Sequence, residues 1–463
     1  MEYDKGKKFT TLALIALNGY IGLALELIVL RQVANFAGNT AAISSIIIGV
    51  YLGAMTIGYF LGAKKSDINI TDKKICVGFL FIASLIVLAA SYPMVFDYFG
   101  IMSSAGIVSN IVQTFIYSFS FLFAAGVLFG FNTAALAQNV SWGGHDNAGV
   151  AMGVGTIGSV LGSLLTTLIF MSIFGTNYAI ILTVILACGC AFAAFRRLWS
   201  LMISVAIIFV AYFFNNGSVL RKNYGVVSNN AESTVAVFNT TNARYLMVDS
   251  ALHSAISNDG TKYAGYINYI NEHFIDTIPS NEIKEILVLG AGGFTVGNLD
   301  ERNNYTFVDI NSAMRDVAER HFLKKKLSAN KRFVVQDAGQ FLRTTSAKYD
   351  LVLMDIFSRW SIPESAITND FMSWMKSVLK PGGIIAMNII ASPAFGDEFA
   401  RKLDNTIRSV FPHNLSRQII GDYNGWKPIE DTNLLYIYFD SPNSGAVYTP
   451  NKNSTIYDKK TAV

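Results

Sequence analysis

The sequence predicts an N-terminal polytopic α-helical membrane bundle of about seven spans, followed by an α/β domain with a parallel, doubly wound sheet. Two observations lead to this prediction. The chain has 463 residues, of which 52% are hydrophobic and only 15% charged, whereas soluble globular proteins carry about 25% charged residues. The apolar runs are concentrated between Phe9 and Phe214, and strands alternate with helices beyond Asn215.

A membrane helix needs about 20 mostly apolar residues. Seven segments meet this requirement: 9–34, 41–62, 75–96, 107–137, 149–174, 178–195 and 198–214. Glycines within them, as in GVGTIGSVLGS at 153–163, allow helices to approach closely. The first segment is too long for a signal peptide. Buried helices of a soluble protein are the alternative, which the number of these segments disfavours.

The first span contains two ionisable residues, Glu26 and Arg31. Charges within a span are costly and are usually paired or functional. Because they are five residues apart, the two side chains lie about 140° apart on a helix and are not expected to bridge. We expect Arg31 to extend toward the membrane surface and Glu26 to pair with another helix, in a structural or a substrate-related role.

Lys and Arg are unevenly distributed among the loops. They precede the first span and separate the second from the third and the sixth from the seventh, as Lys5, Lys7, Lys8, Lys64, Lys65, Lys73, Lys74, Arg196 and Arg197. By the positive-inside rule the N-terminus is cytoplasmic. Seven spans would then place the C-terminal domain outside.

The expected domains are residues 1–215 for the membrane bundle, 216–250 for a small β-hairpin unit, 251–441 for the α/β domain and 442–463 for a polar tail. Period-two patterns at 233–239 and 243–250 predict the hairpin. Further along, expected strands at 285–294, 306–311, 332–339, 349–355 and 382–390 alternate with helices at 311–323 and 366–379.

Four of these strands end in residues suited to binding. The motif GAGGF places Gly290 and Gly292 where the backbone can approach a ligand, and Asp309 follows about 20 residues later, where a carboxylate can accept hydrogen bonds from a ribose. Asp337 and Asp355 end two further strands. Each aspartate alone is commonly a loop cap. Together, at the carboxyl ends of parallel strands, they predict a ligand site.

Composition excludes other classes of site. The net charge of +4 is too small for a nucleic-acid footprint. The three cysteines, Cys76, Cys188 and Cys190, lie in apolar runs and form no disulfide framework or zinc spacing.

The order of glycine loop and three strand-end acids resembles Rossmann-like enzymes that bind S-adenosylmethionine or its decarboxylated form. More narrowly, residues 226–415 resemble spermidine synthase, the polyamine aminopropyltransferase, since ES at 232–233 and RYLMVD at 244–249 are similar to its N-terminal β unit. LALELIVLR at 23–31 and GVYLGAMTIGYFLGAKK at 49–65 resemble the membrane-fused spermidine synthase-like proteins, in which DIFSRWSIPESAITNDF at 355–371 is also typical.

The resemblance implies a role for each acid. Asp309 would bind the ribose, Asp337 the adenine amino group, and Asp355 would orient and deprotonate an attacking amine. Tyr263 lies near the substrate-pocket tyrosine of the family. The co-substrate would be decarboxylated S-adenosylmethionine or S-adenosylmethionine, and no metal is needed because the sulfonium is already an activated leaving group.

Three departures concern the amine side. Gly293 replaces an aspartate of the family's glycine loop, Ser358 replaces a second acid of its catalytic loop, and His253 replaces a glutamine. A diamine carries two positive charges, and a pocket without these carboxylates has less reason to bind one. The nucleoside half of the site is therefore expected to be kept and the amine-acceptor half altered.

The leading interpretation is a membrane-integrated, spermidine synthase-like transferase. A methyltransferase, or an enzyme that cleaves S-adenosylmethionine and releases methylthioadenosine, is the second. A transporter or sensor with a nucleoside- or polyamine-binding domain is the third. The expected partners are an amine or other nucleophile and the lipid bilayer, with no nucleic acid and with a homo-oligomer as an option.

We expect a multi-pass inner-membrane protein whose C-terminal domain faces the cytoplasm, where adenosyl donors are made. This conflicts with the charge-based topology. The conflict would disappear if the number of crossings were even. Segments 107–137 and 198–214 are the two whose count as one span each is in question.

Overall fold

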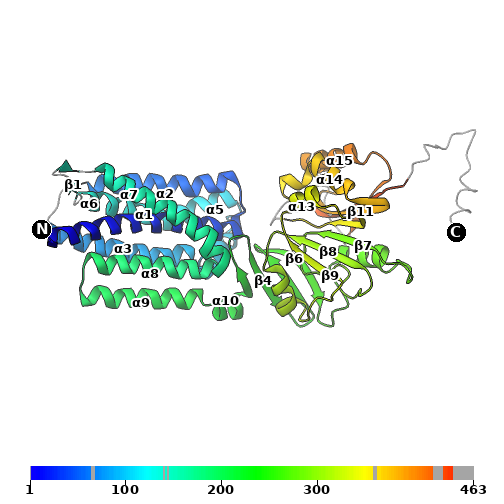
Figure 1. The fold of residues 1–463 in the computed structure, drawn as a ribbon, viewed down its shortest axis with the longest axis horizontal. Coiled ribbons are helices and arrows are strands. Elements are labelled where there is room, and N and C mark those ends of the chain that lie inside the picture. Colours follow the sequence, from blue (N-terminus) through cyan, green and yellow to red (C-terminus); the bar gives the residue numbers. More distant parts are fainter. Residues whose placement is uncertain are drawn as a thin grey trace, which may run out of the picture. The chain divides into compact units, whose positions relative to one another are not determined.

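The computed structural model describes residues 2–63, 68–138, 141–142, 145–146, 148–357, 362–420 and 431–441. The chain divides into two compact units (Figure 1). The first comprises Met1–Lys262 and Ala313–Lys326, and the second comprises Tyr263–Ser312 and Leu327–Val463. Ser358 and the tail 442–463 lie outside the described residues.

The first unit begins with a helical bundle. Its elements are α1 (Glu2–Ala37), α2 (Ala41–Gly62), α3 (Ile68–Ala90), α4 (Tyr92–Ser104), α5 (Asn110–Tyr117), η1 (Ser118–Leu122), α6 (Phe123–Ala137), β1 (Ser141–Trp142), β2 (His145–Asp146), α7 (Ala148–Leu165), η2 (Thr166–Phe174), α8 (Thr176–Ala194), α9 (Leu198–Asn215) and α10 (Gly217–Tyr224). By length and composition, seven helical segments of the described chain could cross a membrane: Lys8–Ala37, Ala41–Gly62, Thr71–Ala90, Asn110–Ala137, Ala148–Phe174, Thr176–Ala194 and Leu198–Asn215. The predicted number of long apolar helices is confirmed.

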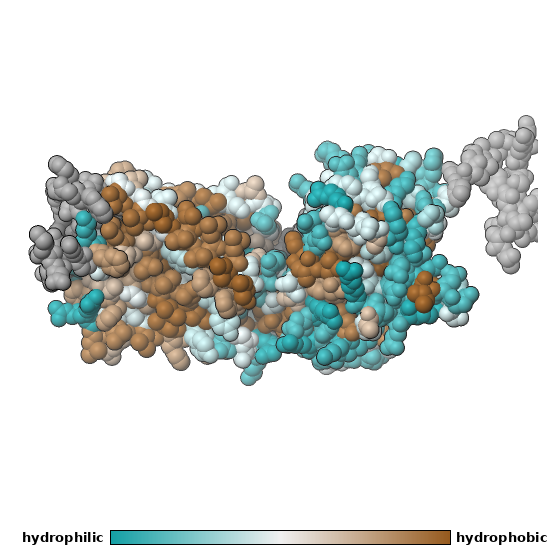
Figure 2. Space-filling view, viewed as in Figure 1, coloured by the Kyte–Doolittle hydropathy of each residue, from teal (hydrophilic) through white to brown (hydrophobic). Residues whose placement is uncertain are grey.

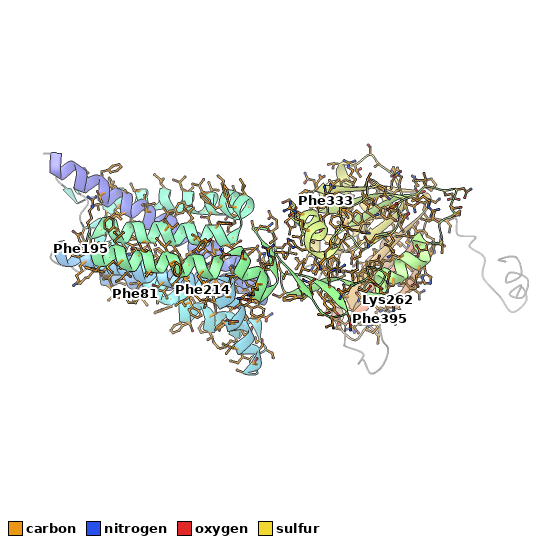
Figure 3. All side chains as sticks on the ribbon, turned by 90° about the horizontal axis from the view of Figure 1, so that it is seen from below. Phe81, Phe195, Phe214, Lys262, Phe333 and Phe395 are labelled. Carbon is orange, nitrogen blue, oxygen red and sulfur yellow. The ribbon has the colours of Figure 1, made fainter. Side chains whose placement is uncertain are left out.

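Large apolar side chains cover the outside of this bundle. Figure 2 shows hydrophobic residues across its surface, while the second unit is mostly hydrophilic. Phe60 on α2 is 74% exposed, Phe81 on α3 (labelled in Figure 3) is 59% exposed and Phe209 on α9 is 68% exposed. Apolar surface of this extent on a soluble protein marks an interaction site or a membrane contact. The outer surface of the bundle is therefore suited to contact the hydrocarbon core of a membrane.

Glycines bring two pairs of helices into close contact. A Cβ atom at Gly158 of α7 would collide with the carbonyl oxygen of Ala16 in α1. A Cβ atom at Gly130 of α6 would likewise collide with the carbonyl oxygen of Met55 in α2. The backbones of α1 and α7, and those of α2 and α6, can therefore approach only because these positions lack side chains.

The bundle is followed by a four-stranded antiparallel sheet in the same unit. Its strands lie in the order β3 (Val226–Asn229), β4 (Thr234–Asn239), β5 (Ala243–Val248) and β6 (Ala251–Ser257). Strands β4 and β5 form the predicted hairpin. Strand β6 lies beyond the boundary expected at residue 250 and pairs with β5.

Arg31, which was expected to extend toward the membrane surface, connects α1 to this sheet. Its guanidinium pairs with the carboxylate of Asp249 at 3.0 Å and donates from Nε to the carbonyl oxygen of Asn230 at 3.0 Å. The side chain is only 9% exposed, and pairing compensates the cost of burying its charge. Glu26, by contrast, accepts no hydrogen bond and forms no ion pair with any described residue of the bundle.

The second unit is built on a seven-stranded sheet in the order β12-β13-β11-β10-β7-β8-β9. Its elements are α11 (Gly265–Ile270), η3 (Asn271–Ile275), β7 (Glu285–Leu289), β8 (Asn304–Asp309), β9 (Lys331–Val335), α13 (Ala338–Thr344), β10 (Tyr349–Met354), η5 (Glu364–Ile367), α14 (Asn369–Ser377), β11 (Leu379–Ala391), α15 (Glu398–Val410), β12 (Leu415–Ile420) and β13 (Thr432–Phe439). Helices α12 (Met314–Val317) and η4 (Ala318–Phe322) belong to the first unit.

The five strands β11, β10, β7, β8 and β9 are parallel, as predicted, and β13 and β12 extend the sheet in antiparallel fashion. Of the strands in this sheet, β7 comes first in the sequence, yet it lies in the middle of the sheet. Strands β8 and β9 follow on one side of β7 and strands β10 and β11 on the other, so the strand order reverses between β7 and β10. Such a reversal opens a crevice at the carboxyl ends of the two strands, where open α/β sheets bind ligands. The fold therefore positions a site at residues 289 and 355.

Candidate active site

Backbone hydrogen bonds hold four strand ends in register at this edge of the sheet. The amide of Asp355 donates to the carbonyl oxygen of Leu289 at 2.8 Å, and the amide of Gly290 donates to that of Val308 at 2.9 Å. The amide of Gln336 donates in turn to the carbonyl oxygen of Asp309 at 3.0 Å. The strand ends that carry the glycine loop and the three predicted acids thus adjoin one another.

The glycine loop lies directly against the end of β10. Gly290 has φ of 91°, a left-handed conformation that side chains rarely adopt, and Gly292 has φ of 48°. A Cβ atom at Gly290 would collide with the carbonyl oxygen of Asp355. Glycine is therefore required at 290 by both its conformation and its contact.

Asp355 is a partly buried carboxylate held by two neutral donors. The hydroxyl of Tyr266, on α11, donates to its Oδ2 at 2.8 Å, and the Nδ2 of Asn388, on β11, donates to its Oδ1 at 2.8 Å. Burial raises the pKa of Asp355 to about 6, although both hydrogen bonds act in the opposite direction. The group can therefore exchange a proton near neutral pH, as a general base must.

Asp309 stabilises the turn after β8 and the start of the glycine loop. Its Oδ2 accepts from the amide of Ala291 and its Oδ1 from the amide of Asn311, both at 2.9 Å. Burial raises the pKa of Asp309, and these backbone amides partly offset the rise. The carboxylate also accepts from the amide of Ile310. A carboxylate has about four acceptor sites, so Asp309 can still accept from a ligand hydroxyl.

Asp337 forms the N-cap of α13. It lies two residues after the end of β9, and its Oδ1 accepts from the amide of Gln340 at 2.8 Å. The carboxylate is exposed. One oxygen is used by the helix, and the other is open to solvent or to a ligand donor.

The other predicted residues are placed less centrally. Tyr263 accepts a hydrogen bond at its hydroxyl from Asn298, 3.1 Å away, in the segment after the glycine loop. His253 is on β6, in the first unit, where burial lowers its pKa to about 4. Gly293 is buried within the glycine loop, and Ser358 is not among the described residues.

Sequence reasoning missed Tyr266 and Asn388, the two partners of Asp355. Asn388 had a visible signal, because it is the single polar side chain within the apolar strand GGIIAMNII. The register of Met354 with Met387 makes Asn388 the neighbour of Asp355. Tyr266 gave no comparable signal, since it lies three residues from another tyrosine, Tyr263.

Among the described residues, no group of three or more His, Cys, Asp and Glu side chains is arranged to hold a metal ion.

Comparison with known proteins relates this unit to polyamine-forming enzymes. Residues 270–426 match the family model described as the spermine/spermidine synthase domain. A polyamine aminopropyltransferase of Vibrio vulnificus is 27% identical over 153 residues, which are 32% of this chain and 50% of that protein. A polyamine aminopropyltransferase of Sulfurisphaera tokodaii is 25% identical over 176 residues, which are 36% of this chain and 56% of that protein.

Among solved structures, a probable spermidine synthase from Corynebacterium glutamicum aligns over 47% of this chain and 81% of its own, with 18% identity and a TM-score of 0.40. The chain spans about half of the length of the curated relatives. The matched region contains the glycine loop and the acids 309, 337 and 355. Residues 270–426 are therefore similar in sequence to the spermine/spermidine synthase domain.

Proposed function

We propose that the protein is a membrane-integrated transferase that acts on an adenosyl sulfonium and moves its aminopropyl group to an amine, with Asp355 as the base. Decarboxylated S-adenosylmethionine is the donor in this reaction. The seven apolar helices anchor the enzyme in the bilayer.

The carboxylate of Asp355 is the observation that carries the proposal. It lies at the switch point of the sheet, beside the glycine loop, and its two hydrogen-bond partners are neutral. No described cation pairs with it. A carboxylate needed only for stability would usually be paired with a cation or used as a helix cap. Asp355 is instead available to a positively charged substrate.

The chemistry follows from this carboxylate. An attacking ammonium transfers one proton to Asp355, and the freed nitrogen lone pair attacks the aminopropyl carbon attached to sulfur. The carbon–nitrogen bond forms as the carbon–sulfur bond breaks. The sulfur keeps the bonding electron pair and becomes the neutral thioether of methylthioadenosine.

The nucleoside half of the site rests on the other strand ends. The acceptor site that Asp309 keeps beside its three backbone donors suits a ribose hydroxyl, and the open oxygen of Asp337 suits the adenine amino group. Gly290 and Gly292 keep the adjoining backbone free of side chains. These assignments follow the resemblance residue by residue.

The acceptor half is proposed to bind an amine with fewer charges than a diamine. Gly293 offers no carboxylate where the family has one. The Oδ1 atom of Asn388 is buried and has no hydrogen-bond partner among the described residues. An amine held beside Asp355 could donate to this oxygen, which would satisfy a costly orphan acceptor.

Methyl transfer is the second candidate. An N-terminal histidine N-methyltransferase of Emericella nidulans is 30% identical over 134 residues, which are 27% of this chain and 23% of that protein. The same nucleoside contacts would serve S-adenosylmethionine, and the altered acceptor half does not select between the two donors. Cleavage of S-adenosylmethionine is a further possible reaction, because it would use the same nucleoside half of the site.

Product identification distinguishes these reactions. The purified full chain in detergent is incubated with each donor, with and without a panel of amines, and the products are identified by mass. We expect methylthioadenosine and an aminopropylated amine from decarboxylated S-adenosylmethionine. S-adenosylhomocysteine would establish methyl transfer, methylthioadenosine from S-adenosylmethionine alone would establish cleavage, and the absence of any product with all donors would contradict the proposal. Asp370→Asn, a change at an exposed aspartate of α14, is the matched control.

A further inference from the structure

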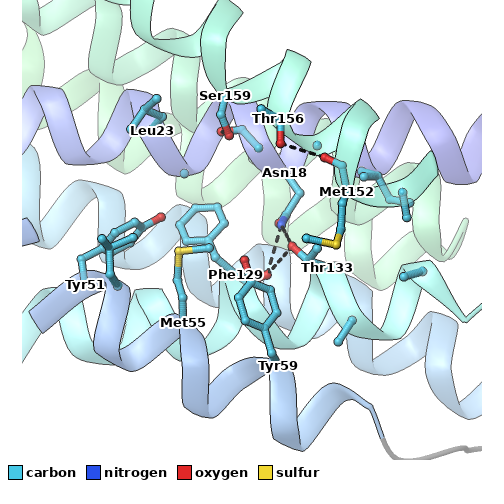
Figure 4. Close-up of a pocket in the computed structure, with 18 of the residues that line it drawn as sticks. Asn18, Leu23, Tyr51, Met55, Tyr59, Phe129, Thr133, Met152, Thr156 and Ser159 are labelled. Atoms are coloured by element: carbon cyan, nitrogen blue, oxygen red, sulfur yellow. Dashed lines mark hydrogen bonds between the residues drawn. The ribbon is translucent and has the colours of Figure 1, made fainter. Parts of the chain in front are cut away.

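A cavity of about 410 Å³ lies within the helical bundle, apart from the strand ends described above. It lies between the closely packed pair α1 and α7 and the closely packed pair α2 and α6, all in the first unit (Figure 4). One water molecule occupies about 30 Å³ in the liquid, so the cavity can hold a small organic molecule. Most of its lining is apolar and includes Leu23, Met55, Phe129 and Met152.

Three buried polar side chains lining this cavity have an unused hydrogen-bonding atom. The carboxyl of Glu26 has no described hydrogen-bond or ion-pair partner, although its residue is only 6% exposed. The hydroxyl of Tyr51 and the Oδ1 atom of Asn18 are also buried and unpartnered among the described residues, and both residues are 2% exposed. Buried polar atoms are almost always paired, so three orphans in one cavity indicate a missing ligand.

These groups adjoin one another on α1 and α2. A Cβ atom at Gly22 would lie 2.8 Å from the hydroxyl oxygen of Tyr51. Residues Asn18, Gly22 and Glu26 are spaced by four and therefore lie along one face of α1. The unpartnered oxygens thus line one wall of the cavity.

Apart from the hydroxyl of Tyr59, the remaining polar groups that line the cavity already donate within the bundle. The Nδ2 group of Asn18 donates to the carbonyl oxygen of Phe129 at 3.1 Å and to Thr133 Oγ1 at 2.8 Å. Figure 4 shows these bonds, together with the hydroxyl of Thr156 donating to the carbonyl oxygen of Met152. The hydroxyl of Ser159 donates in the same way to a backbone carbonyl, that of Gly19. The cavity therefore offers mainly acceptors.

The ligand must then be rich in donors. A primary ammonium has three N–H donors and no acceptor. A sulfonium has no N–H donor at its charged atom and could not satisfy these oxygens. Among the described residues of the lining, Glu26 is the single acidic side chain, so it balances one positive charge. The aromatic rings of Tyr51 and Phe129 favour a cation nearby. The apolar remainder suits an alkyl chain.

We propose that this cavity binds a primary alkylammonium ion carrying a single charge, with Glu26 as its counter-ion. The site is distinct from the strand ends that include Asp355, and the proposal does not depend on the reaction catalysed there. It gives the membrane bundle a ligand of its own and accounts for a carboxyl placed within the apolar first span.

Calorimetry tests the site on the full chain in non-ionic detergent, in an Asp355→Asn background that disables the other candidate amine site. We expect n-butylammonium to bind and the uncharged 1-butanol not to bind detectably. Glu26→Gln should weaken butylammonium binding at least about tenfold, because the ammonium loses its counter-ion and donates to a neutral amide oxygen instead. Tyr51→Phe should weaken it to a smaller extent.

Matched controls come from the same bundle. Asp97→Asn changes an exposed acid of α4, and Tyr98→Phe changes a tyrosine whose hydroxyl donates to the carbonyl oxygen of Gln113, so both should bind butylammonium as the parent does. Equal binding by Glu26→Gln, equal binding of 1-butanol, displacement by equimolar sodium or tighter binding of spermidine would each overturn the proposal. If Glu26→Gln does not fold, Tyr51→Phe and the comparison of charged with uncharged probe still decide it.

Discussion

The chemistry of the candidate site in the second unit depends on the environment of one carboxylate, that of Asp355. Tyr266 and Asn388 donate to Asp355, but neither supplies a positive charge. Burial therefore dominates and raises the pKa of Asp355 to about 6. Protonated Asp355 cannot accept a proton from an amine, so the base becomes active only as the pH rises through this value.

The pH dependence of kcat/KM should report this group. We expect the acidic limb of the profile to have an apparent pKa of about 6. Tyr266→Phe should move the limb to higher pH, because the Tyr266 hydrogen bond favours the charged carboxylate and its loss raises the pKa further. Tyr263→Phe, at a hydroxyl that contacts Asn298 instead, should leave the limb in place. A limb that is unchanged in Tyr266→Phe would show that another group titrates.

The strand-end acids were predictable from the sequence because apolar runs that stop at an acid mark the carboxyl edge of a parallel sheet. Their partners were not. Tyr266 reaches Asp355 from a helix 89 positions earlier, and such contacts depend on tertiary packing that no local pattern encodes. The partner of Arg31 was missed for the same reason, since Asp249 is 218 positions away.

Helix α13 combines two roles in one residue. Asp337 caps the helix through one oxygen and is proposed to meet the adenine amino group through the other. An N-cap typically contributes about 0.5–2 kcal/mol to stability. Because asparagine caps as well as aspartate, the two roles can be separated by choosing the substitution.

Asp337→Asn should keep the thermal stability of the full chain but weaken methylthioadenosine binding. The asparagine Oδ1 atom would still cap α13, and the Nδ2 group that replaces the second oxygen cannot accept a hydrogen bond. Asp337→Ala should lose stability and binding together. Melting curves and calorimetry measure the two effects. Equal methylthioadenosine affinity in Asp337→Asn and the parent would leave Asp337 as a helix cap only.

The helical elements depend on glycine contacts in a comparable way. Gly158→Ala should lower the free energy of unfolding by about 1–3 kcal/mol, as overpacking typically does, because its Cβ atom would collide with the backbone of Ala16. Gly153→Ala, on the same helix α7, meets no atom within 4 Å and should be neutral or stabilising. The melting temperatures of the two variants in detergent measure the difference. If both melt alike, α1 and α7 are not in close contact.

At the same scale, the long elements were the most predictable. Continuous apolar runs fixed the seven bundle helices, and alternating patterns identified the parallel strands. Strands β12 and β13 were not predicted, because only the pairing of β13 with β11, and of β12 with β13, turns these segments into a sheet extension. Strand β6 was likewise not predicted as part of the small sheet, although it pairs with β5.

For the first unit as a whole, the helix directions bear on topology. The ends of α1, α3 and α9 meet, since Gln32 donates to the carbonyl oxygen of Ala90 and Asn215 donates to Ser91. These three helices therefore run in the same direction, and the basic residues Lys8, Lys73 and Arg197 lie at their starts, at the end of the bundle away from Arg31 and the small sheet. The two segments whose single crossing of the membrane was in question, 107–137 and 198–214, correspond to the helical segments Asn110–Ala137 and Leu198–Asn215. Both are long and apolar enough to cross a membrane.

We therefore expect the end of the chain to lie on the side opposite the cytoplasm, against the expectation based on donor supply. The basic residues favour a cytoplasmic start, and an odd number of crossings follows. A reporter fused after Val463 that is active only outside the cytoplasm would agree with this topology. A matched fusion after Ala63 should show the opposite behaviour. Activity of the Val463 fusion only in the cytoplasm would mean that one of the seven helices does not cross.

The central claim is that Asp355 is the reacting base of an adenosyl transferase, and one measurement tests it most directly. The rate of methylthioadenosine release from decarboxylated S-adenosylmethionine and amine is compared between the parent and Asp355→Asn, alongside methylthioadenosine affinity. We predict a rate lower by about 10²–10⁴-fold, the usual contribution of general base catalysis, with affinity and melting temperature retained. Full turnover in Asp355→Asn would contradict the claim and leave this carboxylate without a catalytic role.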